Sequence, residues 1–362
     1  MPRQRLRDLG IIIGEFPTGP YNAITDVAGI LVGHTTLIYD EPRVARTGVT
    51  VITPRSGDVF RDQCFGAYHS FNGNGEMTGV HWLEESGLIG APIAITNTHQ
   101  VGLVRDALVE YETKKYPDSQ WLLPIVAETY DGWLNDINAF HLTKEHLFAA
   151  LDNAQSGPVA EGNVGGGTGM ICHWFKGGIG TSSRRVETPS GVFTIGALVQ
   201  ANYGTRRHLR VNGVPVGQII DTDNVPSPRQ GQKADGSIIV VIATDAPLLA
   251  HQCKRLAQRA TVGLARVGGT GYNGSGDIFL AFATGNHVAL DNTTPVPPLP
   301  TLHMLPNEQM DRLFDATAEA VEESILNALC AAETMTGFQG RVVHALPLEE
   351  LQRVTKLNGD YD

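Results

Sequence analysis

The stretch SIIVVIAT, residues 237–244, decides the fold of this chain. Its residues 238–243 are all apolar, and most of them are β-branched, which favours a strand. A strand that is apolar on both faces has to be buried on both sides and needs neighbouring strands in a sheet. The stretch therefore predicts a layered fold in which this strand lies inside a sheet.

Working outward from residue 237, short strands alternate with helices, as in an α/β protein. The strands predicted upstream lie at 30–38, 48–54, 91–98, 122–129, 169–175 and 192–202, with helices at 101–116 and 143–154. The elements predicted downstream are a helix at 246–267, a turn at 271–276, a strand at 277–284 and helices at 307–334 and 346–356. No composition shift or internal repeat divides the chain, so we expect one domain over residues 1–362.

Composition excludes several classes of function. Hydrophobic residues make up 42% of the 362 residues, yet no apolar run approaches the roughly 18 to 20 residues of a membrane span. The formal net charge of −11 argues against nucleic acid as a partner. The start of the chain, MPRQRLRDLGIIIGEF, lacks the long apolar region and cleavage site of a secretory signal, so we expect a cytoplasmic protein.

Cysteines and histidines give no metal or hydrolase motif. The cysteines Cys64, Cys172, Cys253 and Cys330 are far apart and form no CxxC pair, so we expect them to be buried, without zinc or disulfides. The histidines form no HExxH motif, and no GxSxG motif supplies a hydrolase serine. We therefore expect neither a metal nor a cofactor.

Two glycine-rich segments resemble nucleotide-binding motifs only superficially. GTGYNG at 269–274 has dinucleotide-fingerprint spacing, but a helix precedes it and a strand follows, the reverse of the required order. GNVGGGTG at 162–169 lacks the Lys-Ser/Thr ending of a phosphate loop. This second segment is either a tight turn or a backbone wall that a substrate can approach closely.

The dipeptide Gly236-Ser237 joins a long polar loop, 221–236, to the apolar strand. Loops of more than about 12 to 15 structureless residues are uncommon and are usually functional or disordered. If the bond before Ser237 were cleaved, the serine would gain its own α-amine as a base, with a pKa of about 7.7 to 8.0. The strand would hold this nucleophile rigidly, but Asp-Gly-Ser is also a common turn.

A family resemblance favours the cleavage interpretation. The matching segments are 25–34, 128–138, 162–184, 199–204, 235–248 and 271–284. In these segments the chain resembles the DmpA-like peptidases, which are L-aminopeptidase D-amidase/esterases and β-aminopeptidases that cut themselves before a serine. The resemblance implies a four-layer αββα sandwich of the type shared with ornithine acetyltransferases. It also implies that 1–236 and 237–362 stay associated after cleavage, and that protomers form a homo-oligomer, commonly a tetramer.

The same resemblance assigns catalytic roles around the joint. It implies that Ser237 is the nucleophile and that Gly236-Ser237 is the processed bond. Ser275 and Asp277, in NGSGD, match a serine and a following carboxylate that support the nucleophile and its amine. Some family members have glutamate at the position of Asp277. In isolation, both residues would be ordinary members of a glycine-rich turn.

Three further residues gain roles from the resemblance. Asn202 matches an asparagine of the oxyanion hole. Glu128 matches an acidic residue that recognises the free amino group of the substrate. Tyr130 matches a tyrosine found in the α-aminopeptidase type. Specialists for β-peptides carry an aliphatic residue in place of Tyr130. Without the resemblance, Asn202 would be read as a strand cap and Glu128 as the partner of a lysine.

The sequence thus predicts a self-processing serine aminopeptidase that releases N-terminal residues from short peptides, amides or esters. The alternatives are a specialist β-aminopeptidase, an acyltransferase of the ornithine-acetyltransferase type, and an unprocessed binding protein that keeps the fold. The serine at 237 and the acidic residue at 128 argue against acyl transfer, because the related transferases use a threonine.

Overall fold

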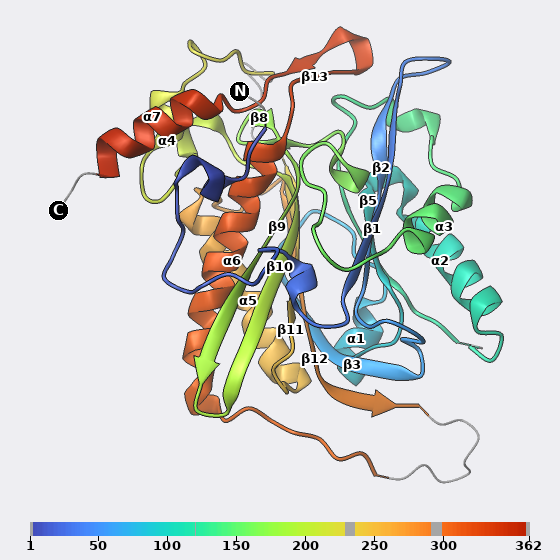
Figure 1. Ribbon diagram of the computed structural model, residues 1–362. Helices are drawn as coiled ribbons and strands as arrows, with labels where there is room; N and C mark the ends of the chain where they lie inside the picture. The colour runs from blue at the N-terminus through green and yellow to red at the C-terminus, as the bar shows by residue number, and fades with distance from the viewer. Residues whose placement is uncertain (1–2, 120, 229–235, 291–298, 360–362) are drawn as a thin grey trace.

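Two β-sheets face each other and helices cover the outer face of each sheet (Figure 1). The computed structural model describes residues 3–119, 121–228, 236–290 and 299–359. The helices α2 and α3 lie outside the smaller sheet, and α5 and α6 lie outside the larger one. The predicted four-layer arrangement of helices and sheets is therefore confirmed.

The smaller sheet has the strand order β1-β2-β5-β6. Its strands are β1 (Leu31–Tyr39), β2 (Ala45–Thr53), β5 (Ile93–Asn97) and β6 (Ile125–Thr129). The helices α2 (Val101–Lys115) and α3 (Lys144–Asp152) bury Val104, Leu108 and Leu147 against its outer face. β5 and β6 are parallel, so Glu128 and Asn97 lie at the same end of the sheet.

The larger sheet has the strand order β4-β3-β12-β11-β10-β9. Its strands are β3 (Asp62–Gly73), β4 (Leu88–Ile89), β9 (Gly178–Thr188), β10 (Gly191–Asn202), β11 (Ser237–Thr244) and β12 (Gly276–Ala289). The helix α5 (Ala250–Arg266) connects the parallel strands β11 and β12. The long helix α6 (Met310–Ala331) packs beside it on the outer face.

The strand β11 lies between two hydrophobic cores, and all of its residues are buried. Ile238, Val240 and Ile242 point into the core beneath α5 and α6. Ile239 and Val241 point the other way, into the core between the two sheets. This alternation explains why the strand is apolar on both faces, and it confirms the prediction made from SIIVVIAT.

The remaining elements are short or peripheral. They are α1 (Val80–Ser86), α4 (Val216–Ile219), β7 (Ile171–Cys172), β8 (Phe175–Lys176), β13 (Met335–Thr336), β14 (Val342–Val343) and α7 (Leu348–Gly359). No helix in the described ranges is both long enough and apolar enough to cross a membrane. Of the predicted loop 221–236, residues 229–235 lie outside the described part, and 221–228 form neither helix nor strand.

The strand predicted at 169–175 is wrong. The segment instead forms the tight hairpin of β7 and β8, because His173 and Trp174 adopt left-handed backbone conformations with φ of 48° and 62°. Two consecutive residues with positive φ reverse the chain, as in the tight turns of hairpins. The apolar composition of GMICHWF gave no sign of this reversal.

Candidate active site

Ser237 is the first residue of β11, in the interior of the larger sheet. It is paired with Asn202, the last residue of β10, and with Gly276, the first residue of β12. The ends of these three strands therefore lie side by side, and Ser237 is only 6% exposed. The strand holds the serine hydroxyl in a fixed place between the two neighbours.

Gly236 fits tightly against the neighbouring strands. Its carbonyl oxygen accepts a hydrogen bond of 3.1 Å from the Gly276 N–H, which also lies 3.3 Å from the Ser237 Oγ. A Cβ atom at position 236 would lie 2.4 Å from the Asn202 carbonyl oxygen and 2.7 Å from the Cα of Tyr203. Only glycine fits here, because the backbones approach too closely for a side chain.

Ser275 and Asp277 flank Gly276 and form a hydrogen-bonded pair. The Ser275 Oγ donates to Asp277 Oδ1 at 2.7 Å, and both residues are buried. Burial raises the pKa of the Asp277 carboxyl to about 6, although the bonds from Ser275 and from the Ile238 backbone oppose this rise. The structure therefore brings both predicted residues to the start of β11.

A pair of asparagines that the sequence analysis missed holds the turn before β12. The Asn74 N–H donates to the Ser275 carbonyl at 3.2 Å, and Asn74 Nδ2 donates to the Gly274 carbonyl at 2.9 Å. Asn72 Nδ2 donates to the Tyr272 carbonyl. The alternating Asn and Gly in FNGNG, 71–75, is the only local signal of this role.

Asn202 joins three segments through its side-chain amide. Its Oδ1 accepts from the Ile171 N–H at 2.8 Å, and its Nδ2 donates to the Tyr130 carbonyl at 3.0 Å. The second N–H of the amide makes no hydrogen bond to any described residue, and Asn202 is 2% exposed. Because its partners are backbone groups of other segments, Asn202 is not a cap of its own strand.

Glu128 lies near the end of β6, in the smaller sheet, and is buried. Its Oε1 accepts from the Glu76 N–H at 3.0 Å, and its Oε2 accepts from the Thr98 hydroxyl. Burial raises the pKa of the carboxyl, and these two hydrogen bonds lower it. No lysine or arginine in the described ranges forms an ion pair with Glu128, so the ion-pair interpretation is wrong there.

Gly75 brings the Glu128 carboxylate close to the larger sheet. A Cβ atom on Gly75 would lie 3.3 Å from Glu128 Oε1 and 3.2 Å from the Cα of Gly276. The backbone at residue 75 thus fills the gap between the carboxylate and the residue paired with Ser237. Only residue 75 therefore separates the buried carboxylate from the start of β12, the strand next to the one that carries the serine.

Tyr130 contacts the site through its backbone. Its carbonyl accepts the Asn202 hydrogen bond, whereas its side chain is 46% exposed and its hydroxyl lies against Gly132. The Tyr130 hydroxyl makes no hydrogen bond to the residues that the structure describes. Of the Tyr130 groups, only the backbone carbonyl is thus tied to Asn202, and the side chain is half-exposed.

The glycine run 162–169 is buried and does not form a wall of the site. Gly166 and Gly167 pack between the sheets, where Cβ atoms would lie 2.7 Å from the Ile95 carbonyl oxygen and 2.4 Å from the Ile179 nitrogen. The tight-turn interpretation is correct for this run. In the described part of the chain, no three His, Cys, Asp or Glu side chains form a group that could hold a metal ion.

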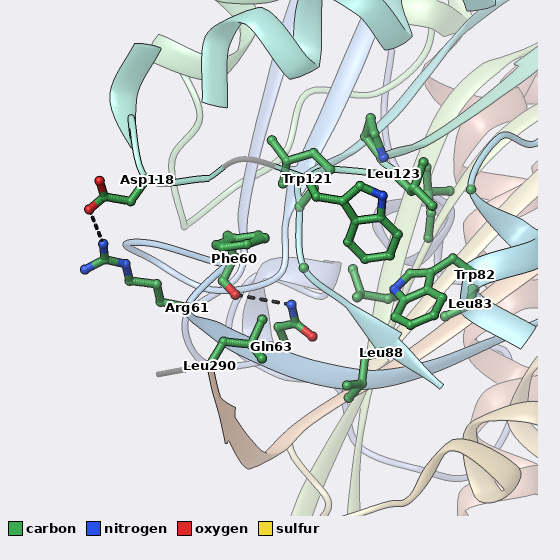
Figure 2. Close-up of a pocket in the computed structure, with 17 residues that line it drawn as sticks. Phe60, Arg61, Gln63, Trp82, Leu83, Leu88, Asp118, Trp121, Leu123 and Leu290 are labelled. Atoms are coloured by element: carbon green, nitrogen blue, oxygen red, sulfur yellow. Dashed lines mark hydrogen bonds and ion pairs between the residues drawn. The ribbon is translucent and has the colours of Figure 1, made fainter. Parts of the chain in front are cut away.

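A separate cavity of about 990 Å³ lies at the opposite ends of the strands (Figure 2). It is lined by Gln63 near the start of β3, Ile125 at the start of β6 and Leu290 beyond the end of β12. Trp82 and Trp121 meet edge to face beside it, with ring centroids 4.9 Å apart. Because Ser237 and Glu128 lie at the other ends of their strands, this cavity is not part of the candidate site.

Comparison with solved structures defines the class. The structure matches an L-aminopeptidase D-Ala-esterase/amidase from Ochrobactrum anthropi, described as a variant of the Ntn hydrolase fold, over 100% of both chains (TM-score 0.92, 46% identity). It matches a β-aminopeptidase from Burkholderia sp. over 99% of this chain and 100% of that one (TM-score 0.93, 52% identity). The protein therefore has the Ntn-hydrolase fold of these enzymes.

Sequence comparison then gives the family. The model of peptidase family S58 matches residues 22–343. A β-peptidyl aminopeptidase, BapA, from Sphingosinicella microcystinivorans is 48% identical over 97% of this chain and 92% of its own length. The chain belongs to peptidase family S58, as the resemblance predicted, and it is a hydrolase of the aminopeptidase type.

The Ser275–Asp277 hydrogen bond generates a prediction about titration. In the uncleaved chain we expect the Asp277 carboxyl to titrate near pH 6. We expect Ser275→Ala to raise this pKa, because the hydrogen bond that the variant loses favours the charged form. Nuclear magnetic resonance of ¹³C-labelled aspartate carboxyls measures both values. Asp131, which is buried and has a pKa of about 7, serves as the reference that should not move. An unchanged Asp277 pKa in the Ser275→Ala variant would show that the Ser275 hydroxyl does not hydrogen-bond to the Asp277 carboxylate.

Proposed function

We propose that the protein is a self-processing serine aminopeptidase that releases N-terminal residues from short peptides, amides or esters. One observation carries the proposal: Ser237 begins a buried strand directly between the Asn202 amide and Gly276, which abuts the segment holding Glu128. The family and the aminopeptidase relatives support the reaction type.

Self-cleavage would begin with attack of the Ser237 Oγ on the carbonyl carbon of Gly236. The acyl group moves from nitrogen to oxygen, and water then hydrolyses the ester to give a Gly236 carboxylate and a free Ser237 α-amine. The Gly276 N–H, 3.1 Å from the Gly236 carbonyl oxygen, is placed to stabilise the negative charge that develops there.

The two resulting chains would remain joined by the sheet. β10 of the first chain pairs with β11 of the second along eight residues, 195–202 against 237–244, and β3 of the first chain pairs with β12 of the second. Cleavage at 236–237 removes none of these strand pairs. We therefore propose that 1–236 and 237–362 act as one protomer.

In the mature enzyme, the Ser237 hydroxyl would attack the first carbonyl of the substrate while its own α-amine accepts the proton. The free N–H of Asn202 would donate to the oxyanion. The α-amine would pass the proton to the leaving group, and water would hydrolyse the acyl-enzyme. The buried Ser275–Asp277 pair lies beside the amine and would orient it.

Glu128 would bind the free amino group of the substrate. A buried carboxylate with both oxygens hydrogen-bonded keeps its charge available for an ammonium group. Its place across Gly75 from Gly276 restricts cleavage to the first carbonyl after that ammonium group. This restriction is what makes a hydrolase an aminopeptidase.

Denaturing electrophoresis tests the self-cleavage. Scaling 38.9 kDa by 236 and 126 of the 362 residues gives fragments of about 25 and about 14 kDa. We expect these two bands from the wild type and a single full-length band from Ser237→Ala, which lacks the attacking hydroxyl. N-terminal sequencing of the smaller fragment should read Ser-Ile-Ile-Val. A single full-length band from active wild-type protein would disprove the proposal.

Glu128→Gln tests the recognition of the amino group. Because a hydrogen bond to a charged group contributes about 1.5 to 3 kcal/mol, we expect kcat/KM for a free-amine p-nitroanilide to fall about 10- to 100-fold. The N-acetylated analogue has no free amino group, so we expect its kcat/KM to be the same for Glu128→Gln as for the wild type. Glu76→Gln is the matched control, since it removes a neighbouring negative charge that acts on Glu128 but keeps the backbone N–H that Glu76 donates to Glu128. Equal losses with both substrates would refute the role of Glu128.

A specialist β-aminopeptidase is the second candidate, because two relatives are named β-aminopeptidases. Tyr130, by the resemblance, favours α-amino substrates. We expect kcat/KM for L-alanine p-nitroanilide to exceed that for the β-homoalanine analogue by at least ~10-fold, a difference of about 1.4 kcal/mol. The reverse order would favour the specialist. Adding an amine acceptor to the assay would reveal an acyltransferase, since the acyl group would then appear on the acceptor.

A further inference from the structure

Lys176 is a fully buried lysine with no acidic partner in the described part of the chain. Its Nζ lies 2.9 Å from the Met170 carbonyl oxygen, 2.8 Å from that of Gly177 and 3.4 Å from that of Gly167. Burial lowers the pKa of its amine to about 7. A buried ammonium group is costly unless its N–H groups are hydrogen-bonded, and three carbonyls match its three donors.

One of these carbonyls belongs to the peptide group that contacts Asn202. The Met170 C=O and the Ile171 N–H are opposite sides of a single planar peptide unit. The C=O accepts from Lys176 Nζ and from the Gly177 N–H, both at 2.9 Å, and the N–H donates to Asn202 Oδ1 at 2.8 Å. A hydrogen bond that the C=O of a peptide accepts polarises the peptide and strengthens the hydrogen bond that its N–H donates.

This hydrogen bond fixes which way the Asn202 amide faces. If the amide were flipped, Nδ2 would face the Ile171 N–H, and two donors would then oppose each other. With Oδ1 held by Ile171, one Nδ2 hydrogen reaches the Tyr130 carbonyl and the second stays free. In the sheet, Asn202 lies directly opposite Ser237.

We propose that Lys176 is a positioning residue that orients the oxyanion-hole amide of Asn202 through the Met170–Ile171 peptide. The inference rests on the proposed function, because it assigns Asn202 to the oxyanion. Lys176 touches neither the substrate nor Ser237. It also ties the buried glycine run to the site, since Gly167 supplies one of its acceptors.

A double-mutant cycle tests this proposal, because the effects of residues that act through one another are not additive. Removing an oxyanion-hole donor costs about 10²- to 10³-fold in kcat, so we expect that loss from Asn202→Ala. We expect Lys176→Met to lower kcat at least ~10-fold in the wild type but less than ~3-fold in the Asn202→Ala background. KM should change less than ~3-fold, because the contacts of Glu128 are untouched.

The controls separate positioning from general loss of stability. Leu313→Ala in α6 removes a buried side chain in the outer core and should lower the melting temperature without coupling to Asn202. The kcat of each variant is calculated per mole of cleaved protein. For a variant that is not cleaved, the rate of self-cleavage at 236–237 is measured instead. An ester in place of the Met170–Ile171 amide replaces the N–H by an oxygen and weakens the carbonyl acceptor while keeping Lys176, so it should also lower kcat and should not couple to Leu313→Ala.

The outcomes are distinguishable. Equal losses from Lys176→Met with and without Asn202 would overturn the inference alone, as would an ester variant with unchanged kcat. If Asn202→Ala itself leaves kcat unchanged, the proposed oxyanion role fails, and the role of Lys176 fails with it. If the wild type is neither cleaved nor active, the proposed function fails at its first step.

Discussion

The structure depends on one constraint, the burial of β11 on both faces and its pairing on both edges. A strand in this position cannot shift its register without exposing one of the two cores or breaking two sets of backbone hydrogen bonds. The position of its first residue is therefore fixed as firmly as its centre. Ser237 is therefore held by a rigid element, although the loop before it has no regular structure in its described residues.

Glycines allow close backbone approaches at the candidate site. At Gly75, Gly236 and Gly276 the space that a Cβ would need is occupied by backbone or by a carboxylate oxygen. The buried carboxyls of Glu128 and Asp277 both have raised pKa values, since burial disfavours their charge. Hydrogen bonds to each carboxyl group offset part of that cost.

The interior also contains polar groups that act at a distance from the serine. Lys176 is bonded to three carbonyls, and one of these belongs to the peptide that holds Asn202. A rotation of the Lys176 or Asn202 side chain would break one of these buried hydrogen bonds, so the network favours a single geometry. The buried glycine run therefore contributes to the site as support for the amide, although it does not face the substrate.

Much of this protein could be predicted from the sequence alone. The apolar run 238–243 determined that β11 is an interior strand, helical spacing located α5 and α6, and a local motif placed Ser275 and Asp277 two residues apart. Asn72, Asn74 and Lys176 gave no comparable signal, because their partners are carbonyl groups of folded turns and such turns leave no periodic pattern. The residues 128, 202 and 237 carry no local sign of contact, since they are distant in sequence. Only the tertiary structure brought them together. The packing of one sheet on the other places Glu128 across Gly75 from Gly276. Strand register places Asn202 opposite Ser237, because backbone pairing decides which distant residues lie opposite each other.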